Sequence, residues 1–183
     1  MKSSADAIAE LLKHLDKEPE REGLRDTPAR YKKFIDEFMH PPSFKPTVFD
    51  SEGYNEMVIQ THIPFYSICE HHLIPFFGHG AIAYVPDKKI IGLSKLARIL
   101  DHVSRSLQNQ ERITVQVADF LAGAISPKGV GVIISARHLC MEMRGIQKPM
   151  VMTTTSCVRG ILKTDPKTRS EFLQLATRQS SIN

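Results

Sequence analysis

The sequence lacks several features that would each define a class of protein. No apolar run approaches the roughly 18 residues that a membrane-spanning helix needs. Tryptophan is absent, and three cysteines are too few, and odd in number, for a disulfide framework. The stretch up to Lys17 is polar and charged, without the apolar centre of a secretion signal. The sequence therefore predicts a cytoplasmic protein without a membrane contact, whose cysteines serve metal binding, catalysis or burial.

No charge of one sign dominates either. The 183 residues include 24 Lys and Arg against 20 Asp and Glu, a net charge of +4, with 42% apolar and 24% charged residues. These values are ordinary for a globular protein of one domain, or of one domain with an extension. The small positive excess suits an anionic ligand. Because the basic residues form no long stripe, we expect no nucleic-acid partner.

Hydrophobic periodicity divides the chain into a helical beginning and a β-rich remainder. From Ser4 to Leu15, apolar residues recur at helical spacing on one face. A second helix begins at Thr27-Pro28, since Thr is a favoured N-cap and Pro a favoured first helical residue. A loop with Pro and Gly follows. We therefore expect an N-terminal helical extension over 1–50 and a catalytic domain over 51–183.

Within that domain the pattern predicts two strands, two helices and two strands, then a last helix from Asp165-Pro166. The segment from Pro64 to Pro75 is interpreted as a loop or an irregular strand. The order is typical of an α+β fold in which two helices cover one face of an antiparallel sheet. The strands are expected at about 57–61, 77–86, 130–136 and 151–157, and the helices from Gly92 and from about Gln110.

Two of the cysteines lie in motifs with metal-ligand spacing. Cys69 and His72 form a Cys-x-x-His pair, and Cys140 comes from a distant segment. Two thiolates and one imidazole suit Zn²⁺, and three protein ligands with an open fourth position are typical of a catalytic site. Such a metal activates water near neutral pH, and His71 and His138 are then candidate general acids or bases. The pattern predicts metal-assisted hydrolysis of a C–N bond.

Other interpretations of these residues stay open. Cys157 could complete a closed, structural zinc site. The cysteines could also be buried apolar side chains and the histidines ordinary ones, since short motifs match by chance.

A candidate anion site lies at the start of the helix from Gly92. Ser94, Lys95 and Arg98 fall in its first turns, where free N–H groups and the helix dipole attract anions. Arg144 follows the second metal motif. The alternative is that these cations decorate a solvated helix face. A zinc hydrolase with a phosphate-bearing substrate would use all of them.

Gln110 and Glu111 begin the next helix. The carboxylate of Glu111 could accept two parallel N–H donors, as guanine presents along its N1 and 2-amino edge. It could equally be a solvated acidic residue that suits the helix N-terminus. Spacing alone does not choose between them.

Several motifs in the same order closely resemble the GTP cyclohydrolase I family. The likeness covers roughly residues 18 to 175. The motifs are EPEREGL at 18–24, SICEHHLIPF at 67–76, GLSKLARI at 92–99, QERIT at 110–114, HLCMEMRG at 138–145 and TRSEFL at 168–173.

This resemblance implies a tunnelling fold (T-fold), assembled as a homodecamer with active sites between subunits. It implies that Cys69, His72 and Cys140 hold Zn²⁺, which activates the water that attacks C8 of GTP. His71 and His138 would transfer protons. The ring would open, formate would leave, and rearrangement would give 7,8-dihydroneopterin triphosphate, the first step of tetrahydrofolate or pterin biosynthesis.

The resemblance also assigns the substrate contacts. The guanine edge would be held by Glu111 with help from Gln110, and the triphosphate by Ser94, Lys95, Arg98 and Arg144. The chain departs from the family pattern at Ala81, Ser135 and Val151, none of which is an expected ligand or proton-transfer residue. A relative that binds another purine or pterin without opening the ring is the alternative within the fold, and a zinc-stabilised nucleic-acid module is the alternative outside it.

Overall fold

The computed structural model describes residues 3–41 and 43–178, and the chain forms two compact units that divide after Pro41. The first unit contains α1 (Ser4–Leu15), α2 (Glu22–Arg25) and α3 (Thr27–Met39). The predicted helix over Ser4 to Leu15 is confirmed. It begins at Ser3 with a capping box, in which the side chains of Ser3 and Asp6 each accept from the other residue's backbone N–H.

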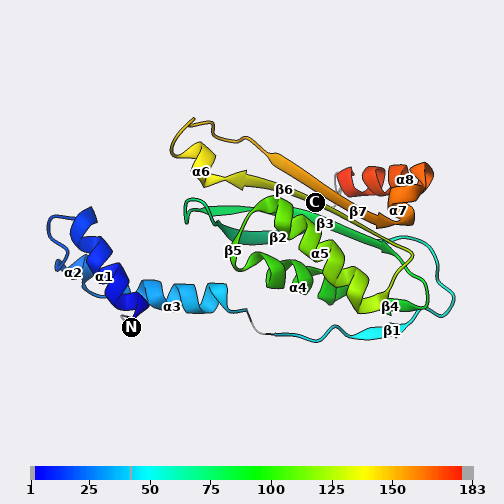
Figure 1. Ribbon diagram of the computed structural model, residues 1–183, viewed down its shortest axis with the longest axis horizontal. Helices are drawn as coiled ribbons and strands as arrows, with labels where there is room; N and C mark the ends of the chain where they lie inside the picture. Colours follow the sequence, from blue (N-terminus) through cyan, green and yellow to red (C-terminus); the bar gives the residue numbers. More distant parts are fainter. Residues whose placement is uncertain (1–2, 42, 179–183) are drawn as a thin grey trace. The chain divides into compact units, whose positions relative to one another are not determined.

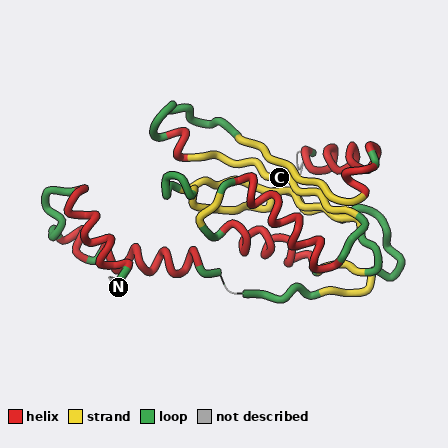
Figure 2. Tube along the Cα trace, in the orientation of Figure 1, coloured by secondary structure: helices red, strands yellow, loops and turns green. Residues whose placement is uncertain are grey.

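The second unit is built on a five-stranded sheet with the order β5-β2-β3-β6-β7 (Figures 1 and 2). The long strands β2, β3, β6 and β7 pair antiparallel, whereas the short β5 runs parallel to the end of β2. A separate two-stranded sheet joins β1 to β4. The strands are β1 (Val48–Asp50), β2 (Val58–Cys69), β3 (Pro75–Val85), β4 (Lys89–Ile91), β5 (Leu107–Gln108), β6 (Gly129–His138) and β7 (Thr153–Gly160).

Helices α4 (Leu93–Ser104) and α5 (Gln110–Ile125) lie against one face of this sheet (Figure 1). They bury an apolar core with the strand residues that point the same way, such as Ile82, Tyr84 and Ile134. The predicted α+β class is confirmed, and the long strands and helices follow the predicted order; the short strands β1, β4 and β5 were not predicted. Together the core side chains fix where the ends of β2, β6 and α5 meet.

The opposite face is also covered at one end, which the sequence did not predict. The short α7 (Ile161–Thr164) and α8 (Pro166–Thr177) place Leu162 and Phe172 against Ala83 and Val85. A side chain at Gly131 would come within 2.8 Å of the Phe172 ring, so this close approach requires glycine. The last helix begins at Asp165-Pro166 as predicted, with Asp165 as its N-cap.

The segment predicted as a loop between Pro64 and Pro75 is mostly strand. β2 continues to Cys69, and only residues 70–74 form the turn into β3. Pro64 is tolerated because it pairs with His79 of β3 on one side, while β5 meets the other side of β2 only at Ile68 and Cys69. Over the described residues, no helix combines the length and the apolar character needed to cross a bilayer.

Candidate functional site

The turn between β2 and β3 carries the first half of the site. The backbone N–H of Cys69 donates to the carbonyl of Ile74, and the carbonyl of Cys69 accepts from Leu73, which adopts a positive φ of 54°. This tight turn brings the Cys69 sulfur to 3.9 Å from Nδ1 of His72. Both side chains therefore point to the same side of the turn.

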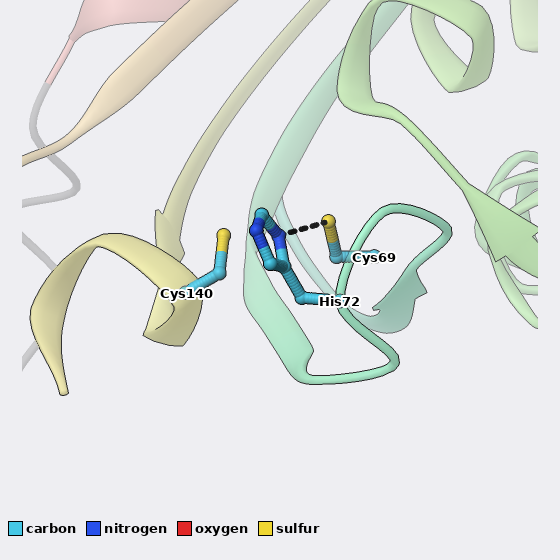
Figure 3. Close-up of side chains that lie close together, drawn as sticks. All are labelled: Cys69, His72 and Cys140. Carbon is cyan, nitrogen blue, oxygen red and sulfur yellow. Dashed lines mark hydrogen bonds between the residues drawn. The ribbon is translucent and has the colours of Figure 1, made fainter. Parts of the chain in front are cut away.

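The end of β6 supplies the second half. His138 is the last residue of β6 and stands opposite Phe76 of β3, with the two rings stacked at a centroid distance of 4.6 Å. The chain then turns at once into the short helix α6 (Leu139–Glu142), which carries Cys140. As Figure 3 shows, Cys140 points toward His72 and Cys69, and one ligand atom from each of the three lies within 4.8 Å of the others.

These three side chains fit a metal ion. Bond lengths of about 2.3 Å to sulfur and about 2.0–2.1 Å to nitrogen require ligand atoms roughly 3.5–3.8 Å apart, so small side-chain rotations complete the geometry. Burial raises the pKa of the Cys140 thiol, and the nearby Cys69 adds to this effect. A cation between the sulfurs would reverse both influences, because it favours thiolates. The cluster is a possible metal site of the soft, zinc-preferring kind.

Cys157 does not belong to this cluster. It lies on β7 opposite Val132 and is buried in the core. Burial raises the pKa of its thiol, as expected for an apolar environment. The structure therefore favours the interpretation with three protein ligands over a closed site completed by Cys157.

The Gln110 side chain points into the protein core and holds the His138 ring by a hydrogen bond. Its side chain is 1% exposed, and its amide Nε2 donates to the carbonyls of Ile134 and Thr153 and contacts the Thr155 hydroxyl at 3.1 Å. Since these acceptors fix the amide NH₂, the Oε1 atom is left to accept from Nε2 of His138, at 2.8 Å. The imidazole is thereby held with its proton on Nε2 and a lone pair on Nδ1.

A cavity of about 230 Å³ opens beside the metal cluster. Its walls include His71, His138 and Glu111, besides the three clustered residues. Burial lowers the pKa of His138, while the Glu111 carboxylate acts in the opposite direction. His71 is exposed, and its Nδ1 lies 3.7 Å from the Cys69 sulfur. The structure thus places both predicted proton-transfer histidines in the wall of one cavity. At His138, burial favours the neutral imidazole.

The predicted anion-binding residues are placed differently. Arg144 reaches the cluster and donates from Nη1 to Nε2 of His72 at 2.8 Å. Ser94, Lys95 and Arg98 lie at the start of α4. The other end of α4 contacts β2, where the Ser67 hydroxyl donates to the carbonyl of Ser104. Ser94 and Ser104 are ten positions apart in the helix, a distance of about 15 Å along its axis. Within the described part of the chain, none of these cations lines the cavity.

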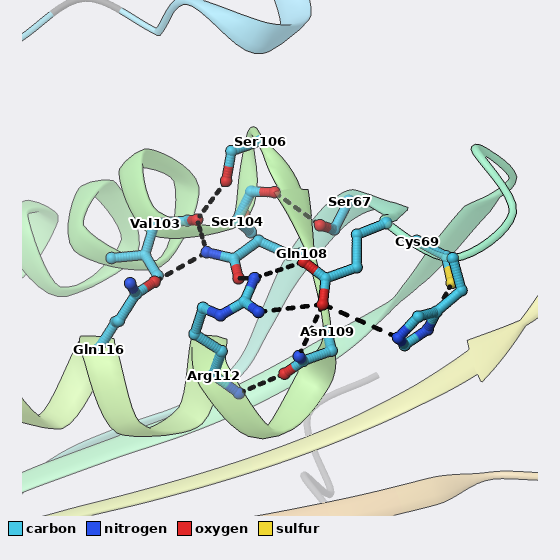
Figure 4. A network of polar contacts seen from close by, with 11 residues as sticks. Ser67, Cys69, Val103, Ser104, Ser106, Gln108, Asn109, Arg112 and Gln116 are labelled. Carbon is cyan, nitrogen blue, oxygen red and sulfur yellow. Dashed lines mark hydrogen bonds and ion pairs between the residues drawn. The ribbon is translucent and has the colours of Figure 1, made fainter.

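Sequence reasoning missed a set of polar contacts behind the cluster. Glu70 pairs with Arg112, and Asn109 and Gln108 join them. Figure 4 shows Arg112, Asn109 and Gln108 of this set with their dashed contacts. The available signal was weak: Glu70 is the neighbour of a predicted ligand, and Arg112 that of a predicted substrate residue. Their contact depends on how β5 aligns with β2, which a single sequence does not reveal.

Comparisons with known proteins identify the family. The profile of the family described as GTP cyclohydrolase I matches residues 4–177. A protein named GTP cyclohydrolase 1 from Aquifex aeolicus is 50% identical over 170 residues, which cover 92% of each chain. Proteins of the same name from Coxiella burnetii (49% identity, 93% of this chain and 96% of that one) and Chlorobium chlorochromatii (46%, 92% and 78%) are also similar.

A solved structure, the archaeosine synthase QueF-Like in the apo form, has a TM-score of 0.45 and 14% identity, covering 58% of this chain and 94% of that one. So weak a likeness carries no argument about the fold. The family profile and the relatives carry the assignment, because they span nearly the whole chain at about half identity. The chain belongs to the GTP cyclohydrolase I family.

Proposed function

We propose that the chain is a zinc-dependent GTP cyclohydrolase I. It hydrolyses GTP at C8 of the guanine ring, releases formate and yields 7,8-dihydroneopterin triphosphate after rearrangement, the first step of tetrahydrofolate or pterin biosynthesis. The observation that carries this proposal is the Cys69–His72–Cys140 cluster beside a cavity that also holds two histidines and Glu111, in a chain of this family.

Cys69, His72 and Cys140 would hold the zinc ion, which supplies activated water near neutral pH. The thiols must be reduced to bind it, which suits the expected cytoplasmic location. These residues come from the β2–β3 turn and from α6, so the site exists only when β3 and β6 are paired. Metal binding and folding of this end of the sheet are therefore coupled.

His138 would accept and return a proton at Nδ1. Gln110 fixes the proton on Nε2, and burial favours the neutral ring. A neutral imidazole with a defined free nitrogen is what a general base requires near pH 7. His71, whose Nδ1 lies 3.7 Å from the Cys69 sulfur, is the second proton-transfer group in this proposal.

Glu111 would hold the guanine. It starts α5 at the wall of the cavity and is exposed, so its carboxylate is free to accept the N1 and 2-amino donors of the base. Gln110 would contribute through His138, because its amide is occupied in the core. This division of roles refines the expectation that both residues contact the base.

The triphosphate would be held by Arg144 together with Ser94, Lys95 and Arg98. The last three lie in the first two turns of α4 and do not line the cavity of their own chain over the described residues. Completion of the site by the α4 start of another copy explains this placement, and it supports a homo-oligomer with shared sites. We include in the proposal the homodecamer of T-fold subunits, with a catalytic domain over 51–183 and a helical extension over 1–50.

Incubation of the purified protein with GTP and Zn²⁺ tests this function. Formate and, after oxidation, neopterin fluorescence should appear together, and a chelator should abolish both. Formate without neopterin would indicate ring opening without reclosure. A folded, zinc-loaded oligomer that releases no formate would overturn the proposal and direct the search to other purines and pterins.

A further inference from the structure

A bidentate ion pair adjoins the metal cluster, because one of its partners, Glu70, follows Cys69 in the chain. The Arg112 guanidinium donates from Nη1 to Oε2 of Glu70 at 2.6 Å and from Nη2 to Oε1 at 3.0 Å. The Asn109 amide adds a third donor to Oε1 at 3.1 Å. Arg112, Asn109 and their contacts are drawn in Figure 4. Glu70 is thus held by two residues that are 39 and 42 positions away in the sequence.

Glu70 is part of the ligand turn itself. It follows Cys69, and its backbone N–H donates to the carbonyl of Gln108 at 3.0 Å. Its Oε1 also lies 3.8 Å from Nε2 of His71. The backbone of Glu70 therefore ties the turn that carries His72 to β5, while the Glu70 carboxylate forms part of the surroundings of the His71 ring.

Arg112 and Asn109 belong to the start of α5. The Asn109 side chain caps that helix by accepting from the backbone N–H of Arg112 at 2.8 Å. The same first turn carries Gln110 and Glu111. The Glu70–Arg112 pair thus connects the metal-ligand turn to the start of α5. That helix start lines the cavity, and its Gln110 holds His138 by a hydrogen bond.

An exposed ion pair usually contributes little to stability. Here, however, a further contact restrains the Arg112 side chain. Arg112 Nη1 lies 3.4 Å from Oε1 of Gln108, which is only 4% exposed. The amide of Gln108 is in turn held by the carbonyl of Val103 and by Gln116. Both partners carry their charge at neutral pH, because a carboxylate and a guanidinium ordinarily titrate far from pH 7. Bidentate geometry within a network is where such pairs become effective.

We propose that Arg112 is a positioning residue: through Glu70 it holds the 69–72 turn in register with the start of α5, and so keeps the metal ligands and His71 in place relative to Glu111. This inference rests on the proposed function for its catalytic consequence, though not for its effect on metal binding. Among the described residues, the Arg112 guanidinium bonds to Glu70 and Gln108 and not to a metal ligand, and Arg112 is not one of the proposed substrate contacts.

The test compares Arg112→Met, Glu70→Gln, the double variant and Arg159→Met. Arg159, on β7, is a matched control. It pairs with Asp119, which lies on α5 like Arg112, and its side chain is 42% exposed, the same value as for Arg112. Zinc affinity is measured by competition with a chromophoric chelator, and kcat and KM by formate release. Thermal unfolding and oligomer size are recorded for every variant.

Arg112→Met should weaken zinc affinity and lower kcat by about 10–100-fold each, with KM for GTP within roughly threefold of the wild type. The double variant should be no worse than the worse single one, because both substitutions break the same contact. Arg112→Lys, which keeps the charge without the bidentate fork, should fall between Arg112→Met and the wild type. Arg159→Met should match the wild type.

Unchanged zinc affinity in folded Arg112→Met, or additive losses in the double variant, would overturn the inference. A raised KM with unchanged kcat would make Arg112 a substrate-binding residue instead. If Arg112→Met does not fold, Glu70→Gln provides the same comparison. Should the wild type release no formate, the proposed function fails, while the zinc competition still decides the role of the pair.

Discussion

Replacing Gln110 by glutamate tests the inward-turned side chain most directly. The change keeps the shape and the Oε1 acceptor but removes the NH₂ group that faces the Ile134 and Thr153 carbonyls. Two hydrogen bonds of about 0.5–1.5 kcal/mol each are lost, and at least one buried carbonyl is left unsatisfied at about 1–3 kcal/mol. We therefore expect Gln110→Glu to lower the free energy of unfolding by about 2–6 kcal/mol.

The same substitution should damage catalysis. The introduced carboxyl, facing carbonyl oxygens in a buried place, gains a raised pKa and no longer fixes the His138 tautomer by elimination. A mis-oriented or wrongly protonated general base costs about 10²–10⁴-fold in kcat. Because a protonated carboxyl can donate again, the stability difference from the wild type should be smaller at pH 5 than at pH 8.

Urea unfolding at a fixed protein concentration measures the first effect, as a fall of about 1–2 M in the midpoint, and formate release measures the second. Gln116→Glu is the control, since Gln116 lies on the same helix, is exposed, and keeps in the variant the Oε1 atom that accepts from Gln108. If Gln110→Glu fails to fold, Thr155→Val removes one acceptor and should cost stability while kcat is kept. An unchanged midpoint together with kcat within about threefold of the wild type would refute the reasoning.

The remaining predictions concern the metal cluster and His138. Cys140→Ser should lose zinc, measured by metal analysis, and release no formate, because only two of the three clustered ligands remain; stoichiometric zinc with full activity would contradict the ligand assignment. His138→Ala should retain zinc and lose about 10²–10⁴-fold in kcat; wild-type turnover would remove His138 from the mechanism. Burial holds the folded-state pKa of His138 below its ordinary 6.5. At a pH between the folded-state pKa of His138 and its unfolded-state value of 6.5, the unfolded chain binds more protons than the folded chain. The contribution of His138 to the free energy of unfolding should therefore decrease as the pH drops below 6.5. The acid limb of kcat/KM should likewise have its midpoint below 6.5, and a midpoint above 7 would contradict the burial of this ring.

The sequence predicted those parts of the molecule that depend on local pattern. The periodicity from Ser4 to Leu15 gave a helix with the observed bounds, since a capping box and one apolar face are properties of a short segment. The ligand set Cys69, His72 and Cys140 followed from motif chemistry, and the structure brings these atoms together. Their role as zinc ligands stays a prediction.

The contacts that the sequence did not predict all join distant segments. The family resemblance assigned Gln110 to the guanine edge beside Glu111. Successive helical positions face different directions, and the packing of α5 on β6 and β7 turns the Gln110 side chain inward. The Glu70–Arg112 pair depends on the two-residue register of β5 with β2. Such alignments are set by the whole core and leave no local signature.

If Arg144 holds the triphosphate and His72 the zinc ion, as proposed, the contact between these two residues links metal and phosphate binding thermodynamically. An imidazole that binds a metal through one nitrogen carries its proton on the other, so His72 cannot accept from Arg144 and bind zinc together. Zinc therefore frees the guanidinium, and an anion that captures the guanidinium frees the imidazole. Linkage is reciprocal, so inorganic triphosphate should raise the zinc affinity of the protein by the same factor by which zinc raises its affinity for triphosphate.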